Sequence, residues 1–135
     1  MLNLIIGIFL VLHGLVHLLY VGQSQRLFEL QPGMAWPDGS WSFGMLLGDG
    51  GARMLASVFL ALAALGFVAG GIGIFARQTW WRPAVVGAAA FSAVIYFLFW
   101  NGKPQRLDNQ GGIGILINLA ILAAVLVFKQ PNFAF

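Results

Sequence analysis

The first apolar run of the chain, residues 2–21, reads LNLIIGIFLVLHGLVHLLYV. At 1.5 Å of rise per residue, a helix over this run is about 30 Å long, which matches the hydrocarbon core of a bilayer. The run contains two histidines, His13 and His17, one helical turn apart. Because an ionisable group is costly in hydrocarbon, we expect this pair to mark a functional site.

The composition of the whole chain indicates an integral membrane protein. Hydrophobic residues make up 60% of the 135 residues and charged residues 8%, with a mean hydropathy of +0.88. A chain of this length has room for about four spanning helices and no separate soluble domain. The seven basic residues are scattered rather than gathered into a stripe, which argues against a nucleic-acid partner. The absence of cysteine excludes disulfides, thiolate metal sites and paired-thiol redox chemistry.

The apolar runs predict an all-α bundle of four transmembrane helices in a single domain, residues 1–135. The expected helices cover residues 2–22, 52–75, 83–100 and 112–128. All five prolines lie outside these runs or in a first turn, where proline is tolerated. Gly66 and Gly70 form a face of small residues that allows another helix to approach closely.

The first connection, residues 23–50, is much longer than the few residues usual in helical bundles. Its apolar residues alternate with turn-forming stretches such as Pro37-Asp38-Gly39-Ser40, so we expect an ordered cap on the membrane surface. Alternatively, its tryptophans are interfacial anchors with no ligand role. The cap residues that we expect to matter are Trp36, Asp38, Trp41, Asp49 and, at the start of the second helix, Arg53.

Four spans place both termini and the 76–82 hinge on one side of the membrane. Counting Lys and Arg alone gives three on that side against four on the capped side, which is nearly a tie. All four acidic residues lie on the capped side. We therefore expect the termini to be cytoplasmic and the cap to be outside.

Each predicted helix carries a hydrogen-bonding side chain in the half nearer the cap, by counting 1.5 Å per residue. Polar side chains in hydrocarbon turn toward neighbouring helices or a wet cavity. We therefore expect a polar pocket between the four helices. Its expected lining is His13, His17, Tyr20, Ser57, Ser92, Tyr96 and Asn118.

The histidine pair can line this pocket for a small polar or amphipathic ligand, and three other interpretations are also open. Two imidazoles at positions i and i+4 can ligate one metal ion, with a third ligand from Asp49, Asp38 or Glu29. Each histidine can also serve as an axial ligand of haem or a chlorin. In the third interpretation, the histidines hydrogen bond to Asn118, Ser57, Ser92 or Tyr96 and fix the register of the helices.

Three stretches of the chain carry a resemblance to known proteins. They are Leu12-His13-Gly14-Leu15-Val16-His17-Leu18, Phe28-Glu29-Leu30-Gln31-Pro32-Gly33 and Trp36-Pro37-Asp38-Gly39-Ser40-Trp41. With them, the chain resembles a group of small bacterial proteins with four spans, which implies a location in the bacterial plasma membrane. It is more distantly similar to the DoxX-like membrane proteins, some of which are linked to quinone-coupled oxidation. That second similarity is limited to the helix count and a first span with glycine and histidine.

Taken together, the sequence favours an accessory or ligand-binding subunit with a polar pocket inside the membrane. The alternative is a haem- or chlorin-binding redox or pigment subunit of a larger complex. A small transporter fits less well, because the half of the bundle away from the cap has almost no polar residues. The spans hold no nucleophile or carboxylate pair, so we expect no enzyme activity from this chain on its own. The expected partners are the lipid bilayer, other membrane subunits or a second copy.

Overall fold

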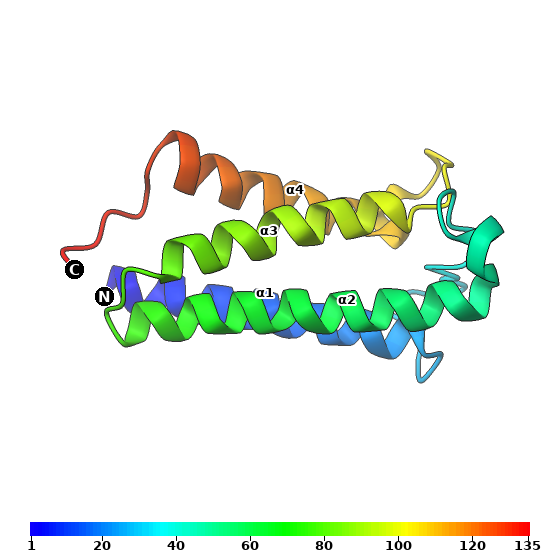
Figure 1. Ribbon diagram of the computed structural model, residues 1–135, viewed down its shortest axis with the longest axis horizontal. Helices are drawn as coiled ribbons and strands as arrows, with labels where there is room; N and C mark the ends of the chain where they lie inside the picture. Colours follow the sequence, from blue (N-terminus) through cyan, green and yellow to red (C-terminus); the bar gives the residue numbers. More distant parts are fainter.

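The computed structural model describes residues 1–135 and contains helices but no strands (Figure 1). Its four α-helices confirm the predicted number, and they are α1 (Leu2–Ser24), α2 (Gly44–Phe75), α3 (Trp81–Leu98) and α4 (Gly112–Leu122). A short 3-10 helix, η1 (Leu107–Gln110), precedes α4, and a π-helical segment, η2 (Ala123–Val127), continues it. By length and composition α1, α2 and α3 can each cross a membrane, whereas the apolar helix over Gly112–Val127 is shorter.

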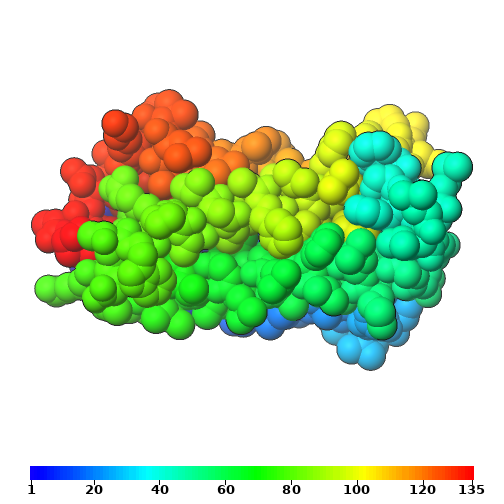
Figure 2. Space-filling model, viewed as in Figure 1, coloured from blue at the N-terminus to red at the C-terminus, as the bar shows by residue number.

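The helices pack in chain order, α1 on α2, α2 on α3 and α3 on α4. Figure 1 shows α1 and α2 side by side, with α3 between α2 and α4. Both termini lie at one end of this elongated bundle, and the connection between α1 and α2 lies at the other (Figure 1). Figure 2 shows the C-terminal segment and this connection at opposite ends. This arrangement agrees with the expected placement of the termini and the 76–82 hinge on one side.

Glycines let α2 approach both of its neighbours closely. A Cβ on Gly71 would lie 2.8 Å from the carbonyl oxygen of Gly7 in α1, and a Cβ on Gly66 would lie 2.8 Å from Cβ of Ala88 in α3. The small-residue face of α2 is therefore covered by α3 within the same chain.

Two helices begin earlier than the apolar runs predict. We expected the second helix to begin at residue 52, but α2 begins at Gly44 and is broken at Gly48, where φ is 68° and ψ is 175°. Glycine adopts this backbone conformation without the steric cost that a side chain adds. The third helix begins at Trp81 rather than residue 83, with Pro83 still in its first turn.

The cap, which in the structure is the segment 25–43, packs onto the ends of the helices. Trp36 is fully buried and Met34 is almost so, and both belong to an apolar cluster with Tyr96 and Phe99 of the third helix and its end. Trp41 remains half exposed, but its Nε1 donates to the carbonyl oxygen of Phe97 at 2.8 Å. Trp36 thus fills the space between the helix ends, and we call it the plug of the cap. Trp41 attaches the edge of the cap to the last turn of α3.

We expect that widening α2 at Gly71 destabilises the protein. In Gly71→Ala the new methyl group meets backbone, which cannot rotate away, so the cost should be about 1–3 kcal/mol. Gly87→Ala is the matched control, because a Cβ there meets nothing within 4 Å and alanine favours a helix. Thermal unfolding in detergent should show a lower midpoint for Gly71→Ala and an equal or higher midpoint for Gly87→Ala.

Candidate functional site

Four buried polar side chains form a hydrogen-bonded network between α1, α3 and α4. Nε2 of His13 lies 2.9 Å from Oδ1 of Asn118, and Nε2 of His17 lies 2.7 Å from Oγ of Ser92. Nδ2 of Asn118 donates to the same Oγ at 2.8 Å, and Nδ1 of His17 lies 2.8 Å from the carbonyl oxygen of His13. The network therefore connects three helices through a closed series of contacts.

The geometry of the network fixes where its protons are. The carbonyl of His13 only accepts, so Nδ1 of His17 carries a proton and Nε2 of the neutral ring accepts from the hydroxyl of Ser92. Ser92 in turn accepts from Asn118, whose Oδ1 accepts from Nε2–H of His13. All these bonds form with both imidazoles neutral, the state that costs least in an apolar interior.

Aromatic rings fill the space around the two histidines. The ring centroid of Phe67 lies 4.6 Å from that of His13 and 5.2 Å from that of His17, and Phe9 stacks on His13 at 5.9 Å. Four cavities of about 350 to 420 Å³ occur in the protein, and none of these four has a histidine in its wall. The structure brings His13, His17, Ser92 and Asn118 together as expected, but as a filled network rather than as the lining of a hollow.

Tyr20 and Tyr96 lie closer to the cap than this network. Their ring centroids are 5.1 Å apart, and that of Trp36 lies 5.4 Å from Tyr20 and 5.7 Å from Tyr96. The ring of His17 also lies near Tyr96, at 5.9 Å. These aromatic residues join the histidine network to the plug of the cap.

Ser57 lies apart from the network. Its hydroxyl donates to the carbonyl oxygen of Arg53 at 2.7 Å and accepts from Nε2 of Gln25 at 2.6 Å. The sequence predicted the depth of Ser57 in the membrane but not the side of α2 on which it lies. Its side chain points toward the residues that follow α1 rather than toward the network.

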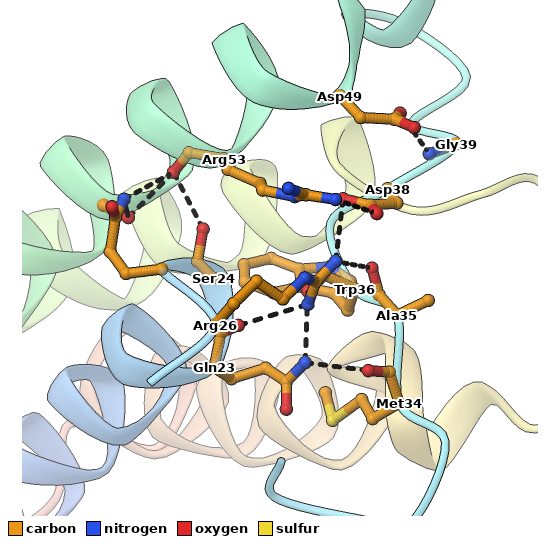
Figure 3. Close-up of polar contacts among 12 residues, drawn as sticks. Gln23, Ser24, Arg26, Met34, Ala35, Trp36, Asp38, Gly39, Asp49 and Arg53 are labelled. Carbon is orange, nitrogen blue, oxygen red and sulfur yellow. Dashed lines mark hydrogen bonds and ion pairs between the residues drawn. The ribbon is translucent and has the colours of Figure 1, made fainter. Parts of the chain in front are cut away.

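An ion cluster holds the cap on the helices (Figure 3). The carboxylate of Asp38 accepts from Nε of Arg53 at 2.7 Å and from Nη2 of Arg26 at 2.8 Å. Burial raises the pKa of Asp38, but the hydrogen bonds and charges of Arg53 and Arg26 outweigh it and hold the pKa below its ordinary value. Asp49 lies beside this cluster and accepts from the backbone N–H of Gly39 at 3.0 Å.

Two residues that hold the cap were not among the predicted ones. The side chain of Gln23 is fully buried, with Oε1 accepting from the N–H of Leu30 and Nε2 donating to the carbonyl of Met34, both at 2.9 Å. Arg26 donates to the carbonyls of Trp36 and Ala35 besides pairing with Asp38 (Figure 3). Gln23 lies in the last turn of α1 and Arg26 lies just after it, where the sequence turns polar, and that change was the only available signal.

A cavity of about 400 Å³ opens between α3, η1 and α4 on the capped half of the protein. Its wall is apolar except for Tyr96, Asp108 and Gln110, and its other lining residues are Phe97, Trp100, Leu107, Gly112, Ile113, Ile115 and Leu116. Gln110 is buried, and its Oε1 has no hydrogen-bond partner. Nε1 of the plug residue Trp36, whose ring lies against Tyr96, also has none. Unpaired buried polar atoms are rare in proteins. This end of the molecule therefore has one acceptor and one donor that the protein itself does not pair.

The metal and tetrapyrrole interpretations fit this arrangement poorly. No group of three or more His, Asp or Glu side chains is close enough to hold one metal ion. Of the suggested third ligands, Asp38 pairs with two arginines, Asp49 bonds to Gly39, and Glu29 accepts from the N–H of Gly33. Both ring nitrogens of His17 and Nε2 of His13 are engaged, so iron ligation there would have to replace an existing bond, and only Nδ1 of His13 has no protein partner.

Comparison of the chain with protein-family models, with curated proteins and with solved structures gives no match. The resemblance to small bacterial proteins with four spans and to DoxX-like proteins therefore stays a prediction.

We expect Ser92→Ala to destabilise the protein more than Ser57→Ala. The first change leaves Nε2 of His17 and one N–H of Asn118 unpaired in the interior, at a cost of about 1–3 kcal/mol per group. The second removes a bond within one helix turn and a bond from the exposed side chain of Gln25, and the freed groups there lie near the surface. Thermal unfolding in detergent measures both, and equal midpoints would contradict the structural role of the network.

The cap should loosen in acid because of Asp38. A carboxylate whose pKa is lower in the folded than in the unfolded state stabilises the fold above its unfolded pKa, about 3.9. That contribution is lost as the pH falls through the folded pKa. The unfolding temperature should therefore fall more between pH 5 and pH 2 in the unmodified protein than in Asp38→Asn. Asp108→Asn is the control, because Asp108 forms no ion pair, and it should retain the full acid dependence.

Proposed function

We propose that the chain is a multi-pass protein of a bacterial plasma membrane. Three helices have the length and composition for this, and their outward surfaces are apolar. Exposed large apolar side chains occur on every helix, among them Leu12, Leu18, Leu62, Leu65, Val94, Phe97, Leu116 and Leu119. The helix over Gly112–Val127 is about 24 Å long and reaches most of the way across a hydrocarbon core of about 30 Å. The proposed orientation places the termini in the cytoplasm and the cap outside.

We propose further that the protein is an accessory or ligand-binding subunit, and that its ligand site is the cavity between α3, η1 and α4. The observation that carries this proposal is Gln110, which lines a mostly apolar cavity and whose buried Oε1 has no hydrogen-bond partner. Pockets for small molecules are mostly apolar, with a few polar groups that orient the ligand, and their usual volumes include 400 Å³.

The cavity favours an amphipathic ligand with a hydrogen-bond donor on an apolar body. The free Oε1 of Gln110 requires a donor such as a hydroxyl, while Phe97, Leu107 and Ile113 suit an alkyl chain or a ring. A molecule of this kind partitions into the bilayer and can enter from the side, because the cavity is open.

In this proposal the histidine pair supports the site rather than binding the ligand. The network of His13, His17, Ser92 and Asn118 holds α3 and α4 together, and these helices form the two long walls of the cavity. This is the interpretation in which the histidines fix the register of the helices, with a ligand site next to it.

A photoactivatable alcohol tests the proposed site. Hexadecanol with a mid-chain diazirine should label the cavity residues of the full chain in nanodiscs, as located by peptide mass spectrometry. Hexadecane with the same diazirine should label them about threefold to tenfold less, which is the range that one hydrogen bond gives. Gln110→Leu should abolish the difference between the two probes.

Gln105→Leu is the matched control, because Gln105 is exposed in the same connection and should leave the preference unchanged. Equal labelling by the two probes in the unmodified protein would contradict the proposal. So would a preference for the alcohol that survives in Gln110→Leu.

A further inference from the structure

A second cavity lies at the opposite end of the bundle, between the start of α3 and η2. It has a volume of about 350 Å³ and is lined by Arg82, Pro83, Val86, Val125, Leu126 and Lys129. Figure 1 shows the end of the fourth helix and the beginning of α3 on the same end of the molecule as the termini. The cavity therefore has two cationic side chains, Arg82 and Lys129, at the end of the bundle. Its aliphatic side chains lie further along the helices, toward the middle of the bundle.

The backbone after η2 shapes this cavity. The π turn closes with bonds from the N–H of Phe128 to Ala123 and from the N–H of Gln130 to Ala124. Lys129 between them has a φ of 52°, in the left-handed region that a lysine seldom adopts. The chain thereby reverses, and the carbonyl of Pro131 accepts from Nη2 of Arg82 at 2.9 Å.

The two cations in the cavity have no acidic partner. Both ion pairs of the protein involve Asp38 in the cap, and the remaining acidic side chains, Glu29, Asp49 and Asp108, are also on the capped side. Arg82 is held by Pro131 and by the ring of Trp81, whose centroid lies 5.2 Å from the guanidinium carbon. Most of its N–H groups remain free, and the ammonium of Lys129 makes no hydrogen bond to the protein.

We propose that this cavity binds the headgroup of an anionic phospholipid, with Arg82 and Lys129 on its phosphate and an acyl chain along Val86, Val125 and Leu126. The proposal rests on the membrane location proposed above. The guanidinium fork matches the geometry of phosphate oxygens, and basic pockets between helices at the cytoplasmic surface favour anionic headgroups. Trp80 and Trp81 beside the cavity are residues typical of this interface.

Native mass spectrometry of the full chain tests the proposal, after release from nanodiscs of equal parts phosphatidylglycerol and phosphatidylcholine. The unmodified protein should retain phosphatidylglycerol in preference to phosphatidylcholine. The double variant Arg82→Gln, Lys129→Gln should retain about tenfold less phosphatidylglycerol, since each cation near the headgroups adds to the attraction. Arg77→Gln, at the same end but outside the cavity, and Lys103→Gln, at the capped end, should retain the full amount.

Lys129→Gln alone keeps the test independent of folding, because Lys129 makes no hydrogen bond that the change would break, and it should lower retention severalfold. Equal retention in the cavity variants and the two controls would overturn the lipid site. Loss of bound lipid on addition of inorganic phosphate would also overturn it, because it would assign the cavity to a free anion. A protein that forms no nanodisc complex at all would instead contradict the membrane location on which both proposals rest.

Discussion

Polar side chains buried in an apolar bundle must find partners within it, and this requirement fixes the position of α4. Asn118 is fully buried and lies within hydrogen-bond distance of both His13 and Ser92. Rotation or sliding of α4 would break both contacts at once and leave up to four polar groups without partners. Leaving even one buried polar group without a partner costs about 1–3 kcal/mol, and the whole free energy of unfolding of a domain is only about 5–15 kcal/mol. The register of the shortest helix is therefore set by hydrogen bonds more than by its apolar surface.

The cavities of the protein follow from this mode of attachment. Glycines bring α1, α2 and α3 together until backbone meets side chain, so little space is left between them. The fourth helix packs mainly on α3 and is held near its middle by Asn118. Three cavities of about 350 to 400 Å³ are lined in part by α4, η1 or η2. Because the fourth helix is held near its middle, space is left open beside its two ends. The two proposed ligand sites are these spaces, one at the start of α4 and one at η2.

The sequence predicted what depends on periodicity and depth, and missed what depends on direction and tertiary contact. Apolar runs gave four helices, and spacing along α1 placed His13 and His17 on an inward face next to Ser92 and Asn118. Ser57 has a similar depth, but it faces Gln25, and depth alone cannot reveal direction around a helix. Gln110 lies in a polar connection that reads like any solvated loop, and only the fold shows that it is buried. The early start of α2 was missed because Gly48 breaks the helical pattern of residues 44–51.

The charges at the two ends differ in a way that a count of lysine and arginine alone does not reveal. Lysine and arginine number four on the capped side and three on the other, which is nearly balanced. However, Arg26 and Arg53 on the capped side are both paired with Asp38, which leaves Lys103 and Arg106 as the cations there without an ion pair. Arg77, Arg82 and Lys129 at the other end have no acidic partner either. In the folded protein the excess of unpaired positive charge is thus at the end with the termini, where an anionic cytoplasmic leaflet would attract it. The four acidic side chains of the capped side also balance its four basic ones, whereas the end with the termini has three basic side chains and no acidic one, and this difference favours the proposed orientation.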